Sequence, residues 1–312
     1  MAESAVKLDE NAHRALLGLK ASVPDDAMTA ELLGTEREGH AVRIRADGLA
    51  LTVGYLVTEA DAVWLTNSDG ESAPANVIAL DHQSGLALVR PDLRIGEAHL
   101  APRRIEDMEP GASVRILNSV GGFALSASLA AVGEFAGRWE YVVDRALYTI
   151  PACDDWGGAA LLDTDGALLG IGSLLLELPT QGGSSVYGNM FVPTELIMPH
   201  VDDLCLYGIR RTPPIPWLGW MVQEHEDGFA VVGIYPDGPA ERAGVQLGDA
   251  VIEVAGRQFD TLGTLFRTVQ SVGSAGAHVP VTVKRESTAI EVDIVSVDRN
   301  AFFQKQPAGP VN

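Results

Sequence analysis

The residues that could perform covalent chemistry are few and widely spaced in this chain. Cys153 is a candidate nucleophile, because a thiol near a histidine can ionise and attack a carbonyl carbon, and the sequence offers His40 and His82. We favour a plainer interpretation, in which Cys153 is a small buried residue and both histidines lie in turns or at the surface. No Gly-x-Ser-x-Gly, His-Glu-x-x-His or phosphate-binding glycine motif occurs in the sequence.

Acidic residues gather at two places that could be taken for metal sites, Asp202-Asp203 and residues 224–227. We favour charge on solvated loops for both, and we predict neither a metal nor a cofactor. Cys153 and Cys205 belong to no Cys-x-x-Cys pair, so a structural zinc site is not expected. A single disulfide between these two cysteines is an alternative that the sequence neither supports nor excludes.

The composition excludes several classes of partner. The chain has 312 residues, a formal net charge of −20 and a sequence pI near 4.6, so phosphate backbones and anionic lipid surfaces would repel it. Nucleic acid is therefore not an expected partner. Hydrophobic residues make up 46% of the chain, which is enough to build ordinary buried cores in two domains.

The sequence shows no segment that would direct the chain to a membrane. Residues 1–10 lack a basic stretch followed by an apolar one, so they do not resemble a secretory signal. The longest apolar run, residues 168–176, is interrupted by glycines and a serine and is too short to cross a bilayer. These features predict a cytoplasmic protein without membrane insertion; a periplasmic location would require that a signal had been removed.

Short strands are predicted for much of the chain. Residues 10–23 are an exception, because apolar residues recur there at helical spacing before Pro24 and predict a lead-in helix. Alternating apolar residues then predict a hairpin over 42–53 with its turn at 46–48. Regular short strands separated by glycine and aspartate are typical of a β-barrel or sandwich; they are predicted at 63–65, 77–80, 86–89, 114–117, 141–143 and 168–171.

Residues 210–216 mark a domain boundary, because three of the last four are proline and fix an extended, stiff connection. After this linker, four strands and one helix-period segment predict a compact α+β module. We therefore expect a helical lead-in at 1–36, a β-barrel domain at 37–209, the linker at 210–216, the α+β module at 217–299 and a disordered tail at 300–312.

This arrangement resembles the HtrA (Deg-type) protease family, in which a chymotrypsin-like double β-barrel precedes a small α+β PDZ domain. The resemblance covers about residues 39–297. The family's run Asp-Gly-x-x-x-Thr-Asn-x-His-Val-Val matches residues 47–57 and places Tyr55 at the histidine. The family's run Asp-Leu-Ala-Leu-Leu, which carries the orienting aspartate, matches residues 85–89 and places Gly85 at that aspartate. In Gly-Asn-Ser-Gly-Gly-x-Leu-Leu, Trp156 stands at the serine and Asp154 at the preceding glycine.

The resemblance implies the fold of a serine protease in which the nucleophile, the base and the orienting residue are replaced. Acyl transfer by a serine requires a base that takes the hydroxyl proton and a third group that orients the base. Tyr55, with an ordinary pKa of about 10, is a poor base at neutral pH, Gly85 has no side chain, and Trp156 is not a nucleophile. Asp154 and Asp155 would add negative charge where the transition state develops it. No catalytic residue is therefore predicted.

The PDZ-like module keeps the family's motifs. Residues 217–220, Trp-Leu-Gly-Trp, match its carboxylate-binding loop, and residues 235–252 match its Pro-x-Ser-Pro-Ala-x-x-Ala-Gly-Leu-x-x-Gly-Asp-x-Ile motif. The resemblance implies that backbone amides of this loop bind a terminal carboxylate while the peptide adds as a strand. It also implies a peptide-binding site that consists of Leu218, Gly219, Trp220, Val222, Leu265, Phe266 and Val269. A plainer alternative is that the apolar residues among them only form the core of the module.

We favour a catalytically inactive HtrA-like protein that binds peptides or protein carboxy termini, as an adaptor, a scaffold or a holder of unfolded chains. The resemblance also implies a homotrimer built by the amino-terminal segment. Two alternatives stay open. One is an active endopeptidase that uses relocated groups, and the other is a purely structural assembly protein.

Overall fold

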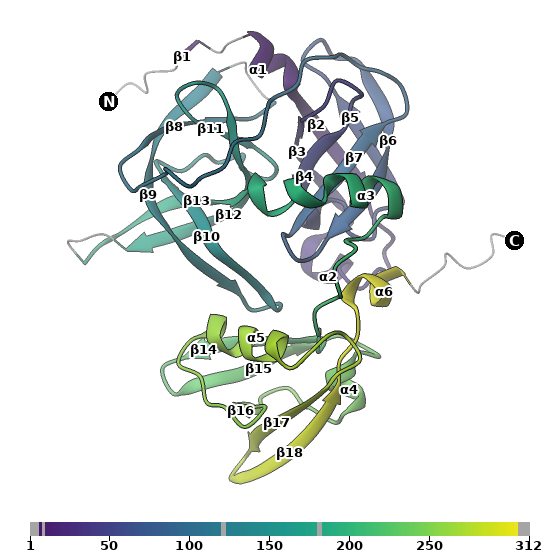
Figure 1. Cartoon of the computed structure of the whole chain (residues 1–312), viewed down its shortest axis with the longest axis vertical. Coiled ribbons are helices and arrows are strands. Elements are labelled where there is room, and N and C mark those ends of the chain that lie inside the picture. The colour runs from purple at the N-terminus through teal and green to yellow at the C-terminus, as the bar shows by residue number, and fades with distance from the viewer. Residues whose placement is uncertain (1–5, 8–9, 120–122, 180–182, 305–312) are drawn as a thin grey trace, which may run out of the picture. The chain divides into compact units, whose positions relative to one another are not determined.

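The computed structural model describes residues 6–7, 10–119, 123–179 and 183–304 (Figure 1). The chain divides into two compact units. The first comprises Met1–Gly133 and Arg145–Ile209, and the second comprises Glu134–Asp144 and Arg210–Asn312. Most of the predicted disordered tail, residues 305–312, lies outside the described residues.

The first half of the first unit is a closed antiparallel barrel with the strand order β2-β3-β4-β7-β6-β5 (Figure 1). Apolar residues such as Leu51, Leu65 and Leu88 are fully buried within it, as the alternating pattern predicts. Its strands are β2 (Leu16–Ser22), β3 (Glu36–Arg43), β4 (Ala50–Val53), β5 (Ala62–Thr66), β6 (Ser72–Asp81) and β7 (Leu86–Pro91).

The predicted lead-in helix over 10–23 is wrong beyond Ala15, because α1 (Glu10–Ala15) ends there and β2 begins. β2 is hydrogen-bonded to β3 on one side and to β5 on the other. Leu17, Leu19 and Ala21 are all buried, which is the two-residue period of a strand. Pairing with two distant strands thus overrides a local spacing that also fits a helix.

The second half of the first unit is a sheet with the order β1-β9-β10-β13-β12-β11-β8, and β8 also pairs with β9, which closes it. Its core includes Leu147, Leu161, Leu169 and Phe191. The predicted double β-barrel is therefore confirmed. The strands are β1 (Val6–Lys7), β8 (Ser113–Leu117), β9 (Phe123–Gly137), β10 (Tyr141–Ile150), β11 (Ala160–Leu162), β12 (Leu168–Pro179) and β13 (Ser185–Pro193).

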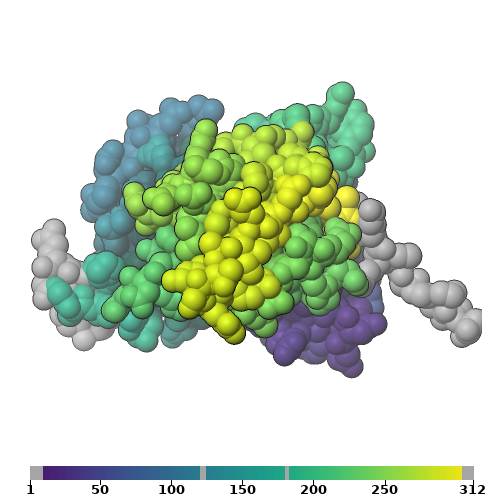
Figure 2. Space-filling model, turned by 90° about the horizontal axis from the view of Figure 1, so that it is seen from below, coloured from purple at the N-terminus to yellow at the C-terminus, as the bar shows by residue number. Residues whose placement is uncertain are grey.

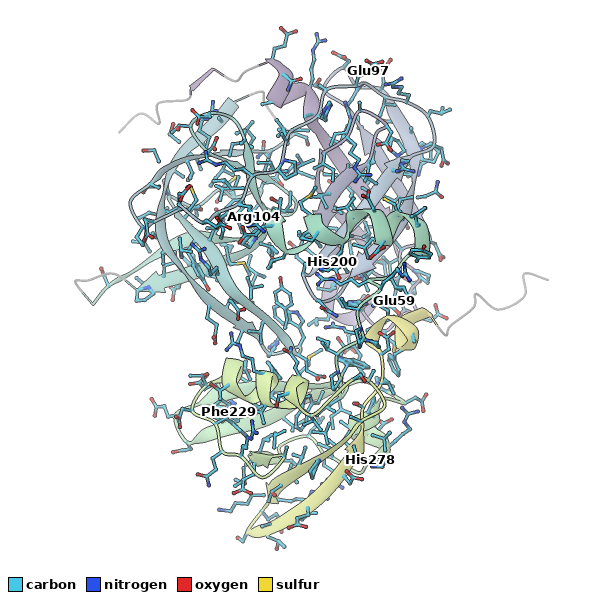
Figure 3. All side chains as sticks on the ribbon, viewed as in Figure 1. Glu59, Glu97, Arg104, His200, Phe229 and His278 are labelled. Atoms are coloured by element: carbon cyan, nitrogen blue, oxygen red, sulfur yellow. The ribbon has the colours of Figure 1, made fainter. Side chains whose placement is uncertain are left out.

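Short helical segments connect the strands of this unit. The Glu59 carboxylate (Figure 3) accepts hydrogen bonds from the amides of Met28 at 3.1 Å and Thr29 at 2.8 Å, and so fixes the start of the second helix. The segments are α2 (Ala30–Leu33), η1 (Gly54–Leu56), η2 (Thr194–Leu196), η3 (Met198–His200) and α3 (Val201–Tyr207). Over the described ranges, no helix is long and apolar enough to cross a membrane.

The second unit contains a sheet with the order β14-β15-β16-β17-β18. The last two strands lie on the face turned to the viewer in Figure 2. On this sheet the ring of Phe229 meets Phe259 edge-on at 4.9 Å, and His278 Nδ1 lies 2.6 Å from Asp293 Oδ2 (Figure 3). The strands are β14 (Trp220–His225), β15 (Gly228–Ile234), β16 (Ala250–Val254), β17 (His278–Arg285) and β18 (Thr288–Val295).

Three helices complete the described part of the second unit, α4 (Pro239–Arg242), α5 (Leu262–Ser271) and α6 (Arg299–Gln304). Thr261 caps α5 by accepting a hydrogen bond from the Thr264 amide at 3.1 Å. The predicted disorder is wrong for residues 300–304, because α6 is helical and its Phe302 ring packs 4.9 Å from that of Trp217. The predicted α+β module after the linker is confirmed.

Candidate functional site

The structure brings the three degenerate positions Tyr55, Gly85 and Trp156 to one place in the first unit. Tyr55 lies on η1, and the neighbouring Gly54 amide donates to the Gly85 carbonyl at 2.8 Å. The Tyr55 hydroxyl donates to the Ser173 carbonyl on β12 at 2.9 Å, and Trp156 hydrogen-bonds to the same hydroxyl. The segments that carry Tyr55, Gly85 and Trp156 are therefore neighbours in the first unit.

Tyr55, Gly85 and Trp156 do not supply the base, the orienting carboxylate and the nucleophile that a serine protease uses for acyl transfer. Burial raises the pKa of Tyr55 to about 12, although the hydrogen bond with Trp156 opposes the shift. At neutral pH the hydroxyl therefore stays protonated and donates a hydrogen bond to the Ser173 carbonyl, which makes it a poor base. Gly85, with φ 72°, provides a tight turn and no orienting group, and the half-buried Trp156 offers only an indole N–H donor.

Close backbone approaches hold the turn that follows Trp156. The Gly157 carbonyl accepts from the His40 amide at 2.8 Å, and the Gly158 amide donates to the Gly172 carbonyl at 2.9 Å. A Cβ atom on Gly158 would overlap the His40 carbonyl, and one on Gly172 would overlap the Trp156 carbonyl. The turn is therefore fixed between β3 and β12 by positions that tolerate only glycine.

Beneath this turn lies a polar chain that sequence analysis missed in part. His40 Nδ1 lies 2.8 Å from Ser119 Oγ and accepts from the Ser119 amide at 3.3 Å. Its Nε2 lies 3.0 Å from Asp155 Oδ2, in a geometry too bent for a good hydrogen bond. Because a backbone N–H only donates, Nδ1 carries the lone pair and Nε2 carries the proton.

Ser119, His40 and Asp155 are the residue types of a hydrolase triad, but the burial of His40 argues for a structural role. The His40 side chain is only 3% exposed, and burial lowers its pKa although Asp155 opposes that shift. Asp155 is largely exposed and Ser119 is half-buried. Sequence analysis considered His40 only as a partner of Cys153 and Asp155 only as an unfavourable charge, and it missed Ser119, which lies far along the chain in no recognisable motif.

The remaining candidates for chemistry in the first unit also have structural partners. Cys153 is half-buried, and burial raises the pKa of its thiol, which is the opposite of an activated nucleophile. Its amide donates to Asn189 Oδ1 at 2.6 Å, and both Cys153 and Cys205 are free thiols. Asp202 pairs with Arg45 at 2.6 Å, and no group of three His, Cys, Asp or Glu side chains within the described residues could hold a metal.

The predicted carboxylate loop of the second unit points its amides at a carboxylate. The Leu218 amide lies 2.9 Å from Glu140 Oε2, and the amides of Gly219 and Trp220 lie 2.8 Å and 3.3 Å from Glu140 Oε1. Part of Glu140 reaches solvent, yet its carboxylate is enclosed. Burial raises its pKa to about 7, although the three amides and the positive charge of Arg299 lower it.

The other predicted peptide-site residues lie in the core of the second unit. Leu265, Phe266 and Val269 on α5 pack with Trp220 and Val222 and are fully buried. In this conformation they make core contacts, as the plainer alternative expects. The Val222 amide nevertheless donates at the edge of the sheet, to the Arg138 carbonyl at 2.9 Å.

Comparison with known families matches both units. The model described as "Trypsin-like peptidase domain" matches residues 39–171, and the model described as "PDZ domain" matches residues 216–295. The chain is 26% identical over 283 residues to "Probable periplasmic serine endoprotease DegP-like" of Halomonas elongata, covering 83% of this chain and 56% of that protein. It is 27% identical over 297 residues to "Serine protease PepD" of Mycobacterium tuberculosis, covering 85% and 62%.

The chain spans about half the length of the curated relatives it matches. Among solved structures, the HtrA-type protease AlgW with decapeptide superposes with a TM-score of 0.56 at 21% identity, covering 93% of this chain and 97% of that chain. The serine endoprotease from Yersinia pestis superposes with a TM-score of 0.55 at 21% identity, covering 92% and 95%. This structural likeness shows that the fold is shared.

We predict that Gly158→Ala lowers the free energy of unfolding of the first unit by about 3 kcal/mol or more, because the new Cβ overlaps the His40 carbonyl at φ 81°. Gly70→Ala is the matched control, since Gly70 has φ 83° and no atom within 4 Å of the new Cβ. This control isolates the cost of the left-handed backbone, about 1 kcal/mol. Urea denaturation followed by tryptophan fluorescence measures both, and equal losses would contradict the prediction.

The enclosed Glu140 carboxyl predicts a pH dependence of stability. Its folded-state pKa of about 7 lies above its ordinary 4.5, so its contribution is fully present below pH 4.5 and is lost as the pH rises through 7. Relative to Glu140→Gln, which does not titrate, the wild type should lose about 2 to 3 kcal/mol of unfolding free energy between pH 5 and pH 8. Urea denaturation at both pH values tests this, and pH profiles that run parallel would refute it.

Proposed function

Because the chain belongs to the HtrA-type family, in which a trypsin-like peptidase domain is joined to a PDZ domain, we propose that it is a catalytically silent member that binds peptides or protein carboxy termini. The observation that carries the first part is the Tyr55 hydroxyl, which stands at the position of the family's histidine and donates a hydrogen bond to the Ser173 carbonyl at 2.9 Å. Its high pKa, the absent side chain at Gly85 and the indole at Trp156 support the same conclusion.

The peptide-binding part of the proposal is supported by the direction of the loop amides. Those of Leu218, Gly219 and Trp220 converge on one carboxylate, which is the chemistry that recognises the end of a peptide. The positive φ of Gly219, 74°, allows successive amides to point the same way. β14 lies at the edge of its sheet, so a peptide strand has backbone groups there to pair with.

A second candidate function is serine-type hydrolysis with relocated groups, and the Ser119, His40 and Asp155 chain is the observation that favours it. In this mechanism Ser119 Oγ would attack and His40 Nδ1 would take its proton, since that nitrogen carries the lone pair. The burial of His40 weighs against this mechanism, because a substrate would have to reach a histidine side chain that is only 3% exposed.

A fluorescence-quenched casein assay separates these two functions. We expect no turnover by the wild type above a blank and no labelling by a fluorophosphonate probe. Labelling that disappears in Ser119→Ala would establish the relocated site and refute the silent reading. The triple variant Trp156→Ser, Tyr55→His, Gly85→Asp supplies the three missing groups, and activity regained by it would show that the barrel keeps the geometry that catalysis needs.

Peptide binding is tested by fluorescence anisotropy with a diverse set of labelled peptides that carry free carboxy termini. We expect binding with millimolar affinity or better, and loss of binding when the terminus is amidated. Gly219→Ala should abolish binding, because its Cβ would press on Pro239 Cδ at 3.0 Å and distort the loop. Gly244→Ala, at φ 87° with no atom within 4 Å of the new Cβ, should bind as the wild type does.

If no peptide bound either to the wild type or to Glu140→Ala, in which the loop amides lose their resident carboxylate, the purely structural assembly role would be the better account. A periplasmic location accords with the names of the DegP-like relatives, whereas none of these names supports a cytoplasmic one. Cell fractionation decides between the two. The homotrimer that the family resemblance implies stays a prediction for light scattering to check.

A further inference from the structure

The donors that should bind a peptide terminus already have a partner in the same unit. The Glu140 carboxylate takes three converging amides, with its closest contacts at 2.8 Å to Gly219 and 2.9 Å to Leu218. A terminal carboxylate of a peptide would need the same three donors. Charge-assisted hydrogen bonds of this kind are about twice as strong as neutral ones, so a second carboxylate cannot enter without displacing the first.

The segment that carries Glu140 also uses the edge strand. β14 pairs with β15 on one side, and on its other side the Val222 amide donates to the Arg138 carbonyl at 2.9 Å. An added peptide strand would hydrogen-bond along that same edge. Arg138 and Glu140 therefore reproduce two features of a bound peptide, a backbone acceptor beside the strand and a carboxylate in the loop.

Helix α5 holds the same segment from the other wall of the groove. Arg267 Nη1 lies 2.7 Å from Glu134 Oε2, and Arg267 also pairs with Asp144. Ala136 and Val142 pack against the apolar core that contains Leu265 and Phe266. Residues 134–144, which we call the occluding hairpin, thus contact β14, the carboxylate loop and α5 together.

The occluding hairpin is ordered by its own contacts. The rings of Trp139 and Tyr141 stack with their planes 9° apart and centroids at 6.1 Å, and Phe135 packs against both. Glu140 adopts φ 59°, a strained conformation for this residue that the surrounding contacts must hold. Arg299 on α6 donates to the Trp139 carbonyl at 3.2 Å. Little conformational entropy is then lost on docking, so a pre-formed ligand binds well.

We propose that the occluding hairpin is an intramolecular ligand that closes the PDZ groove, with Glu140 standing in for the terminal carboxylate of a peptide. This inference rests on the proposed peptide-binding function. It assigns the groove an acidic occupant in its resting state and requires that an extended peptide with a free carboxy terminus displace that occupant. The apparent dissociation constant of the peptide then equals its intrinsic value divided by the fraction of molecules with an open groove.

Peptide affinity in the full chain tests this competition. In Glu140→Ala the loop loses its resident carboxylate, and a labelled peptide with a free terminus should bind about tenfold or more tightly than to the wild type. Arg267→Ala, which loosens the hairpin without touching the carboxylate loop, should shift affinity in the same direction. Glu291→Ala removes an exposed glutamate on β18 and should leave affinity unchanged. Equal affinity of the wild type, Glu140→Ala and Arg267→Ala overturns the inference while the proposed function survives.

Amide hydrogen exchange tests docking without any peptide. The amides of Leu218, Gly219 and Trp220 should be protected in the wild type and should exchange at least tenfold faster in Glu140→Ala. Unchanged exchange in Glu140→Ala and Arg267→Ala overturns the inference. Faster exchange together with no peptide binding by any variant overturns the proposed function, and with it the role of the hairpin as a competitor.

Discussion

A carboxylate that is removed from water must be given hydrogen-bond donors, and this constraint organises the second unit around Glu140. An unpaired buried charge would cost several kcal/mol, so the loop at 217–220 has to present its amides in one direction. Gly219 makes this possible, because only a residue with positive φ lets successive N–H groups form a concave nest. The loop is therefore an anion site by construction, and in this structure a side chain of the same unit fills it.

A groove occupied by its own chain cannot be distinguished from a core by burial alone. Leu265, Phe266 and Val269 are fully buried, which fits both a module core and a closed pocket beneath the occluding hairpin. Hydrogen-bond direction separates the two, because apolar packing places no requirement on amides. Three amides that converge on a carboxylate, beside a sheet edge that donates to a backbone carbonyl, form a recognition surface that apolar core packing does not require.

Turn residues and strand alternation are local signals, and they predicted a β-barrel or sandwich followed by an α+β module, whereas the double barrel came from the family resemblance. The same resemblance singled out Tyr55, Gly85 and Trp156, which lie near one another in the first unit. Sequence analysis failed where long-range pairing decides the outcome. β2 is a strand because two distant strands flank it, and neither Ser119 nor Glu140 stands in a motif that points to its partner. Contacts between residues far apart in sequence leave no periodic trace that one sequence can show.

The survival of the turn at 156–158 does not imply that catalysis survives with it. Gly39, Gly158 and Gly172 each lie where a Cβ would strike the backbone of a neighbouring segment, so packing alone requires glycine at these positions. The side chain at position 156 is under no such requirement, because it is only half-buried. Backbone geometry and side-chain chemistry are therefore constrained separately. A chain can lose the nucleophile, the base and the orienting carboxylate while the frame that once aligned them is still enforced by close contacts.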